Sequence, residues 1–250
     1  MSHTSPTPPT FEALPEDWQT ALFVVAHPDD IEYGAAAAVA RWTGQGKRIV
    51  YCMVTSGEAG IDGLHPDECA PLREAEEIAS ARTVGVDEVE FLHLPDGILE
   101  YGVALRRVIT EVVRRHRPDI AMTINFRETF GGTNLNQADH IAVGKALLDA
   151  VRDAGNRWIF PEQLTDGLEP WGGVRAVWAG GSPQSTHAVD VTDTFAAGVA
   201  SLKEHKAYID GLGWEGWDPE EFLDGILRVG GQGLGVTHAS TFEVFPLGWG

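Results

Sequence analysis

Apolar runs of strand length alternate with longer segments of helical period from residue 21 onward. This pattern predicts strands over 21–26, 48–54, 89–92 and 119–124, and helices over 33–45, 71–84, 103–116 and 137–154. Strands and helices that take turns are typical of βαβ units, whose right-handed crossovers build a parallel sheet with helices on both faces. We therefore predict the α/β class and a Rossmann-like three-layer sandwich with a mainly parallel sheet.

The alternation is weaker after residue 154. The pattern there predicts a loop over 158–173, a strand over 174–178 and helices over 192–208 and 219–228. A length of 250 residues with 43% hydrophobic content suits one substantial core, so we expect a single domain over 17–250. Residues 1–16 contain four prolines and no apolar segment of signal-peptide length, which predicts a flexible N-terminal arm.

The charge of the chain disfavours polyanionic partners. Its 37 acidic residues outnumber the 18 Lys and Arg residues and give a formal charge of -19. Binding to nucleic acids and anionic membranes rests on Lys and Arg, so we expect neither partner. No segment approaches the roughly 20 apolar residues of a membrane span. The two cysteines form no CxxC pair, and we expect reduced thiols and a cytoplasmic location.

The polar residues with the most unusual spacing lie in HPDD and shortly after it. His27, Asp29, Asp30 and Glu32 follow the first predicted strand, at the sheet edge where ligands bind in open parallel sheets. One carboxylate would suffice to cap the next helix, and this capping interpretation stays open for Asp29 or Asp30. Three acids beside an imidazole repel one another unless a cation lies among them, which favours a divalent metal site.

A second polar group lies at the start of the predicted helix 137–154. His140 stands in its first turn, close in sequence to Gln137 and Asp139, and can face the same sheet edge as His27. A lone histidine there is most often a surface residue, but its pairing with HPDD favours a ligand. Two histidines and one carboxylate leave open positions, as in catalytic zinc sites, and the same trio suits Fe²⁺.

The motifs together resemble the LmbE-like or PIG-L deacetylases. The resemblance rests on AHPDDIEYG, VTSGEAG, the pair Arg73 and Glu74, LPDG at 94–97 and ADHIAVG at 138–144, which occur in family order. It implies a zinc-dependent hydrolase that removes an N-acyl group, in the family an acetyl group, from an amino sugar or its conjugate. HPDD followed by DHxAVG is a specific pair of motifs, so chance is a poor explanation.

The resemblance also implies a role for each site residue. His27, Asp30 and His140 would bind zinc, Asp29 would be the general base, and Arg73 and Asp96 would hold the sugar. Family members commonly carry a histidine where this chain has Gln137, which can donate a hydrogen bond to an oxyanion but delivers no proton. Two plainer interpretations stay open: Arg73 in a surface ion pair with Glu76 or Glu77, and Asp96 in a turn with Gly97.

Other functions remain as alternatives. The same machinery would serve an amidase that cleaves a thiol-conjugate or another non-acetyl amide, and the loss of histidine at Gln137 leaves room for a catalytically weak carbohydrate-binding protein. A nucleotide-binding domain is disfavoured because HPDD replaces the glycine-rich phosphate loop. We expect a small-molecule substrate and leave a homo-oligomer open. His205 could line the pocket, but an exposed helix position is the default that we expect. Trp171, Trp214 and Trp217 lie in glycine-rich loops where they could stack on a sugar, although core or interface packing is the more usual role.

Overall fold

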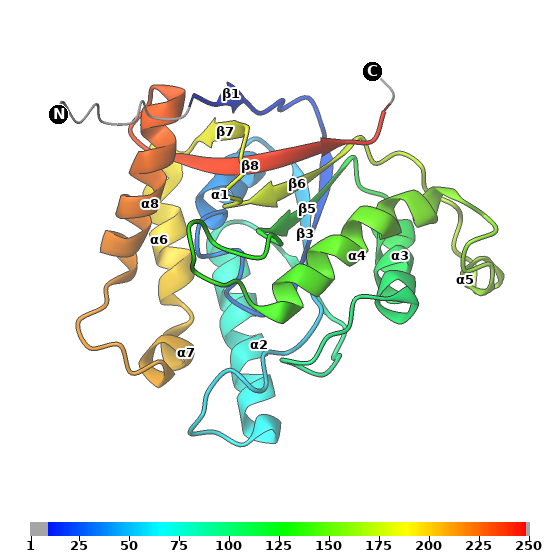
Figure 1. Cartoon of the computed structure of the whole chain (residues 1–250), viewed down its shortest axis with the longest axis horizontal. Coiled ribbons are helices and arrows are strands. Elements are labelled where there is room, and N and C mark those ends of the chain that lie inside the picture. Colours follow the sequence, from blue (N-terminus) through cyan, green and yellow to red (C-terminus); the bar gives the residue numbers. More distant parts are fainter. Residues whose placement is uncertain (1–9, 249–250) are drawn as a thin grey trace.

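A single mixed sheet organises the described part of the chain, residues 10–248 of the computed structural model (Figure 1). Its strands are β1 (Glu12–Ala13), β2 (Thr20–Val25), β3 (Arg48–Met53), β4 (Glu88–Phe91), β5 (Ile120–Ile124), β6 (Ala176–Gly180), β7 (His187–Asp190) and β8 (Ala239–Pro246). Their order is β1-β7-β8-β6-β5-β2-β3-β4. Neighbouring strands run parallel except where β8 pairs with β6 and β7.

Helices cover both faces of this sheet. They are α1 (Ala36–Gly44), α2 (Pro66–Thr83), α3 (Val103–His116), α4 (Ala138–Gly155), α5 (Glu162–Thr165), α6 (Phe195–Lys203), α7 (Lys206–Gly211) and α8 (Pro219–Leu234), with a 3₁₀ turn η1 at Thr192–Thr194. Buried side chains of α1, α2, α6 and α8 share one hydrophobic cluster, and those of α3 and α4 share the other. The predicted three-layer α/β fold with a mainly parallel sheet is confirmed.

Strand β2 shows why the apolar runs are continuous. Ala21, Phe23 and Val25 point into the cluster that contains α1, whereas Leu22 and Val24 point into the cluster that contains α4. All five side chains are fully buried. A parallel strand covered on both faces needs apolar side chains at every position, which explains the run ALFVV. The burial fixes β2 at the centre of the molecule and places the HPDD segment directly at its carboxyl end.

The predicted N-terminal arm is wrong for residues 10–16. Strand β1 pairs with β7, Leu14 is buried, and the Glu16 carboxylate accepts hydrogen bonds from Arg41 (2.9 Å) and Trp42 (2.8 Å). These contacts hold the segment against the sheet, and its one proline, Pro15, lies outside the two paired residues of β1. The rest of the predicted arm, residues 1–9, lies outside the described residues.

The C-terminal third differs from the sequence prediction in three ways. Strands β7 and β8 were not predicted, and β8 supplies the antiparallel part of the sheet. The helix predicted over 192–208 is broken into η1, α6 and α7, with the break at 204–205. Helix α8 runs six residues further than expected, to Leu234, and ends where Gly235 adopts a positive φ of 83°. A glycine is the residue that takes this left-handed position at a helix end without strain.

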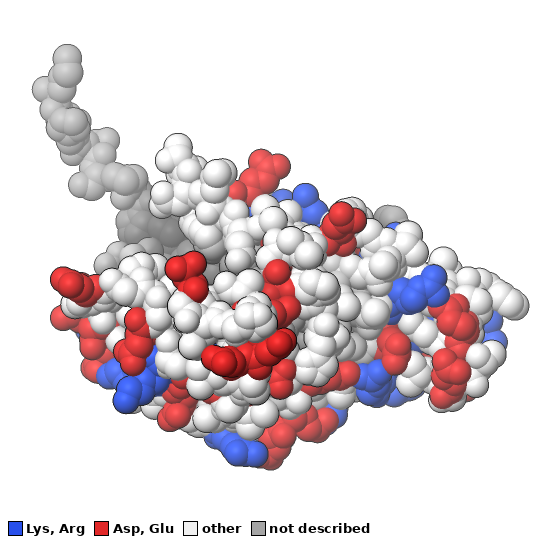
Figure 2. Space-filling view, turned by 90° about the horizontal axis from the view of Figure 1, so that it is seen from below, with Lys and Arg blue, Asp and Glu red and all other residues white. Residues whose placement is uncertain are grey.

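The charged side chains of the surface are mixed. On the face that Figure 2 shows, Lys and Arg side chains lie singly or in small groups beside Asp and Glu side chains. Within residues 10–248, no helix is both long and apolar enough to cross a membrane.

Candidate active site

Three strand-end segments carry the predicted site residues to one edge of the sheet. His27 follows β2 by two residues, Asp96 lies in the turn after β4, and the segment after β5 leads into α4 and His140. Strands β2, β4 and β5 all run in the same direction, so their carboxyl ends meet at this edge. The topology thereby brings together residues that are far apart in the sequence.

His27, Asp30 and His140 lie together as predicted. The Asp30 Oδ1 atom is 2.9 Å from His140 Nε2, and its Oδ2 atom is 3.6 Å from His27 Nδ1. One ligand atom from each residue lies within 4.8 Å of the other two. Two imidazole nitrogens and a carboxylate oxygen are a donor set that zinc prefers, and they leave positions for water and substrate. We call these three residues the ligand trio.

The two histidines of the ligand trio have a defined orientation. The Asn136 amide nitrogen donates to the backbone oxygens of Asn125 (2.8 Å) and Arg127 (2.9 Å), so its oxygen faces His140 Nδ1 at 2.9 Å. An amide oxygen only accepts, and Nδ1 therefore donates to Asn136, while Nε2 is the nitrogen that faces Asp30. The loop after β5 thus fixes which nitrogen of His140 is available to a metal.

Asp96 and Asp139 determine which ring nitrogen of His27 faces Asp30. Its Nε2 atom lies 3.0 Å from Asp96 Oδ1 and 3.4 Å from Asp139 Oδ2, which leaves Nδ1 for the side of Asp30. His27, Asp96 and Asp139 are themselves close enough to hold an ion. However, Asp139 already accepts the backbone N–H groups of Gly97 (2.7 Å) and Leu99 (3.0 Å). This pattern is typical of carboxylates that support a ligand histidine, and it favours the ligand trio as the metal site.

The electrostatics of the ligand trio suit a cation. Burial lowers the pKa of His27, but the nearby carboxylates of Asp30, Asp139 and Asp96 raise it well above its ordinary value. Burial likewise raises the pKa of Asp30, but His140 and His27 hold it well below the ordinary range. A field that favours a proton on the imidazole also favours a divalent ion between the same groups. The residues present therefore fit a metal ion.

Asp29 adjoins the ligand trio without belonging to it. Its backbone has a positive φ of 92°, a conformation that costs a non-glycine residue on the order of 1 kcal/mol and persists only where neighbours hold it. The Asp29 carboxylate lies 3.1 Å from Arg73 Nη2, and the Asp29 N–H donates to Glu77 Oε2 at 3.0 Å. Burial raises the pKa of Asp29 to about 6, while Arg73 acts in the opposite direction. A carboxyl group with such a pKa exchanges protons readily near neutrality.

Residues 22–151, just over half of the chain, match the profile of a family described as PIG-L, GlcNAc-PI de-N-acetylase. The chain belongs to the PIG-L family.

Two curated relatives name an activity. A diacetylchitobiose deacetylase of Thermococcus kodakarensis is 28% identical over 232 residues, which cover 92% of this chain and 84% of that protein. A 1D-myo-inositol 2-acetamido-2-deoxy-alpha-D-glucopyranoside deacetylase of Saccharopolyspora erythraea is 28% identical over 208 residues, covering 73% of this chain and 71% of that protein. The named relatives of this PIG-L protein are thus deacetylases of N-acetylated amino sugars.

A solved structure supports the same fold. The N,N'-diacetylchitobiose deacetylase of Pyrococcus horikoshii, complexed with an inhibitor, superimposes with a TM-score of 0.84 and 24% identity. The match covers 92% of this chain and 85% of that one, so it includes the C-terminal segment beyond the family profile. At this identity the likeness shows the fold.

Arg73 of this PIG-L protein is buried below the site. Its side chain is 2% exposed, donates to the backbone oxygen of Pro28, and lies over the Tyr208 ring at 3.8 Å from the ring centre. Gly57 and Gly60 pack so closely on the guanidinium that a Cβ at either position would collide with it. The surface ion pair that we left open for Arg73 is therefore wrong. A sugar-binding role for Arg73 stays a prediction.

Asp96 and Gln137 lie at different depths. The Asp96 side chain is 5% exposed, and besides facing His27 it accepts the Ala59 N–H at 2.8 Å. Gln137 is exposed at the N-cap of α4, one helical turn before His140, and its side chain does not cap the helix. Its side chain is therefore accessible from solvent at the start of α4, the helix that carries His140. The roles predicted for both residues stay predictions.

Several residues of the site escaped the sequence analysis. Asn136 was not considered, and Asp139 was named beside His140 without a role. Both lie just before His140, and their polar character so close to a ligand was the available signal. Glu77 was considered only as a surface partner of Arg73, although a spacing of four residues puts both on one face of α2. His205 was expected to be exposed, and this is wrong: its side chain is fully buried.

A second buried polar group lies behind Asp29. Glu32, Glu77 and His205 have ligand atoms within 4.8 Å of one another and exposures of at most 1%. The His205 Nε2 atom lies 3.7 Å from Glu32 Oε2 and 3.6 Å from Glu77 Oε2. The Ser80 hydroxyl donates to Glu32 Oε1 at 2.7 Å. We call these three residues the sealed cluster, because their burial leaves no opening for a substrate.

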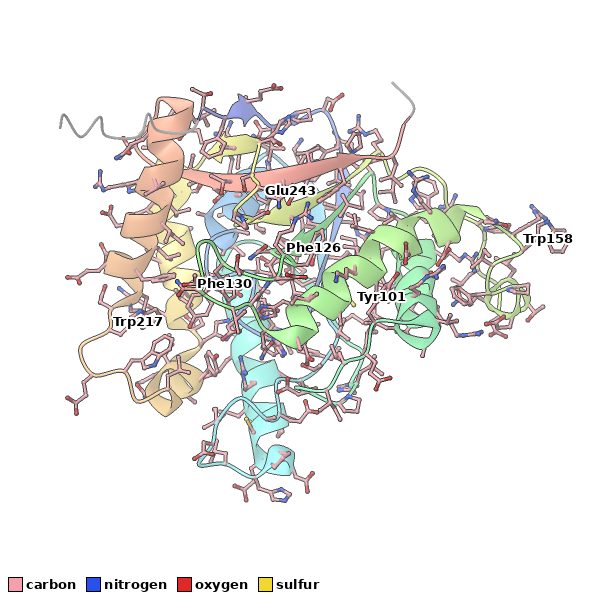
Figure 3. All side chains as sticks on the ribbon, in the orientation of Figure 1. Tyr101, Phe126, Phe130, Trp158, Trp217 and Glu243 are labelled. Atoms are coloured by element: carbon pink, nitrogen blue, oxygen red, sulfur yellow. The ribbon has the colours of Figure 1, made fainter. Side chains whose placement is uncertain are left out.

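Aromatic side chains differ in their relation to the site. Phe130, in the loop before α4, is 53% exposed and meets His140 edge to face with ring centres 6.2 Å apart (Figure 3). Trp217 packs on Tyr33, close in sequence to the HPDD segment. Trp171 instead donates to the Pro118 oxygen at 2.8 Å and is a packing residue. Of these side chains, Phe130 stands nearest to a predicted metal ligand.

Proposed function

We propose that the protein is a zinc-dependent N-deacetylase that hydrolyses the acetamide of an N-acetylated amino sugar. The observation that carries the proposal is the ligand trio together with a second carboxylate, Asp29, which directly precedes Asp30 in the sequence, lies outside the trio and is paired with Arg73. Supporting side chains orient both ligand histidines, as expected for a catalytic and not merely acidic site. His27, Asp30 and His140 would hold the zinc ion.

Bound zinc would polarise the amide carbonyl and lower the pKa of water toward neutrality. The residues of this chain supply the proton transfers. Asp29 accepts a proton from the attacking water as the water oxygen bonds to the carbonyl carbon. The C–N bond then breaks, the nitrogen takes the proton from Asp29, and acetate and the free amine leave. The pKa of about 6 suits Asp29 for both directions of this transfer.

The remaining side chains would act on the substrate. We propose that the Gln137 amide donates a hydrogen bond to the oxygen that becomes negative in the transition state. Its exposed position at the start of α4 permits such a contact. We still propose that Arg73 and Asp96 contribute to substrate binding. Because both side chains are nearly buried, we expect them to act indirectly, Arg73 by holding Asp29 and Asp96 by holding His27.

The substrate class follows from the relatives. We propose a small N-acetylglucosamine derivative, either a short chitin fragment such as N,N'-diacetylchitobiose or an N-acetylglucosamine linked to inositol. The sequence-based alternatives use the same site: an amidase acting on a thiol-conjugate, or a binding protein with weak catalysis. Cytoplasmic location and homo-oligomer formation stay predictions.

One assay separates these possibilities. The zinc-loaded enzyme is incubated with N,N'-diacetylchitobiose, N-acetylglucosaminyl-inositol and an N-acylated thiol-conjugate, and the released amine and acid are identified by mass spectrometry. We expect release of acetate and an amino sugar from at least one of the first two substrates. Release only from the thiol-conjugate would favour the amidase, and binding of the sugars without release would favour the binding protein.

A further inference from the structure

The strained backbone of Asp29 needs a structural cause. Its φ of 92° lies in the left-handed region, which a residue with a Cβ adopts uncommonly, although aspartate does so more often than most. The turn places the side chain of Asp29 toward Arg73 while Asp30, the next residue, faces His140. Two consecutive carboxylates can serve different partners only while this turn holds.

Glu77 makes one of the contacts that hold this turn, and it is the one made to the Asp29 backbone N–H. Its Oε2 atom accepts the Asp29 N–H at 3.0 Å, and its side chain is fully buried. Arg73, one helical turn earlier on α2, approaches the Asp29 carboxylate. Helix α2 therefore holds Asp29 at two points, the backbone through Glu77 and the carboxylate through Arg73.

The C-terminal part of the chain supports Glu77. His205 lies at the junction of α6 and α7, 3.6 Å from Glu77 Oε2 and 3.7 Å from Glu32 Oε2. Within residues 10–248, neither ring nitrogen of His205 has a hydrogen-bond partner. Its ring therefore acts on the two carboxylates through proximity and charge. The Ser201 hydroxyl, one turn earlier in α6, contacts the Ser80 hydroxyl at 2.6 Å and extends the network to α2.

We propose that Glu77 is a positioning residue for Asp29, with His205 as its support from the C-terminal segment. The proposal rests on the proposed function, because it assigns Asp29 as the group that handles the proton. Without an acceptor at residue 77, the buried Asp29 N–H has no partner, and the peptide turns to find one. The carboxylate then leaves its working position, whereas the ligand trio stays in place.

A matched pair of variants isolates the hydrogen bond. Glu77→Gln keeps an oxygen that can accept the Asp29 N–H, whereas Glu77→Met has similar size and no comparable acceptor. We expect kcat on N,N'-diacetylchitobiose to fall about 10²-fold in Glu77→Met, at unchanged KM and zinc content, and by no more than about threefold in Glu77→Gln. Gln163→Ala, in α5, is the control for a general loss of stability. It removes the buried oxygen that accepts a hydrogen bond of 2.8 Å from Arg114.

A double-mutant cycle distinguishes positioning from a structural role. If Glu77 acts through Asp29, Glu77→Met has no further effect on kcat in an Asp29→Asn background, because residues that act as a unit are not additive. The same 10²-fold loss in both backgrounds would overturn the proposal. Absence of deacetylation by the zinc-loaded wild type would instead overturn the proposed function.

A structural readout keeps the proposal testable without activity. In a crystal structure of zinc-loaded Glu77→Met, or of Glu77→Ala if the first variant fails to fold, we expect Asp29 to leave the left-handed region and its carboxylate to move away from Arg73. The ligand trio should be unchanged. An Asp29 that keeps the wild-type backbone and contact with Arg73 would refute the positioning role.

Discussion

The ligand trio and the sealed cluster use the same donor chemistry for different ends. Each combines histidine with carboxylates, and in each the ligand atoms lie within 4.8 Å of one another. In the ligand trio, the outer nitrogen of each histidine faces an oxygen of another side chain, and His140 is partly exposed. In the sealed cluster all three residues are buried, and Glu77 Oε2 already accepts a hydrogen bond from the Asp29 N–H. We therefore propose that access to the ligand atoms, and not residue type, distinguishes the ligand trio as the metal site.

Metal binding gives the largest expected contrast between the two groups. We expect about one zinc ion per chain, and we expect His140→Ala to lose most of it together with all measurable hydrolysis, because the remaining donors hold zinc poorly. Glu32→Gln, in the sealed cluster, should keep the ion. Metal analysis by mass spectrometry after loading, with a chelator-treated sample as reference, checks both. A second tightly bound ion that disappears in Glu32→Gln would erase the distinction.

Asp29 lies between the ligand trio and the sealed cluster, and a variant at this position tests whether Asp29 is itself a metal ligand. Asp29→Asn should retain zinc but lose about 10²- to 10⁴-fold in kcat/KM, because an amide accepts no proton from water. Asp30→Asn should lose zinc as well. Parallel metal analysis and kinetics on one substrate separate the two carboxylates. Equal zinc loss in both variants would show that Asp29 is a ligand.

Gln137 tests the rim of the ligand trio. Removing one donor to a developing oxyanion typically costs about 10²- to 10³-fold, so we expect Gln137→Ala to lower kcat by up to this factor at unchanged zinc content. Gln19→Ala alters an exposed glutamine before the amino end of β2, at the opposite end of that strand from HPDD, and should leave kcat unchanged. An unaltered rate in Gln137→Ala would mean that the side chain does not face the reacting carbonyl.

The sealed cluster should reveal itself in the pH dependence of stability. Burial lowers the pKa of His205, but Glu32 and Glu77 raise it to about 9, above the value of about 6.5 in an unfolded chain. The folded state therefore binds the proton more tightly. The contribution of the His205 proton to the free energy of unfolding is complete below about pH 6.5 and is lost as the pH rises through about 9.

Urea unfolding of the metal-free protein at pH 6.5 and pH 9.5 measures this effect. We expect the wild type to lose free energy of unfolding over this interval, and His205→Gln to lose less. Equal losses in the two proteins would show that His205 is not the titrating group.

The sequence revealed the part of the fold that is built from local units. Strands β2 to β5 and helices α1 to α4 follow from periodicity, since each lies in a βαβ unit with its own apolar pattern. Strand β1 has two residues, too few to show a period. Strand β7 is as long as β4, but it lies after residue 154, where the regular alternation of strands and helices has ended. Their existence depends on pairing with distant strands, which no local pattern encodes.

The candidate site likewise contains residues that a local pattern predicts and residues whose placement depends on tertiary packing. HPDD and DH lie at element ends that the pattern located, so the ligand trio could be inferred. The burial of His205 could not, because it depends on a break between α6 and α7 that the sequence shows as one helical period. The hydrogen bonds from Gly97 and Leu99 to Asp139 likewise form only when the start of α4 meets the loop between β4 and α3.

The position of β8 has a consequence for the order in which the molecule can assemble. It is the last described strand in the sequence, yet it lies inside the sheet, between β6 and β7. As the chain leaves the ribosome, the part from β2 to β6 can close by itself, while β1 and β7 reach that part only across β8. We therefore expect cotranslational folding in two stages, in which β1, although synthesised before β2, joins the sheet only after β8 has formed.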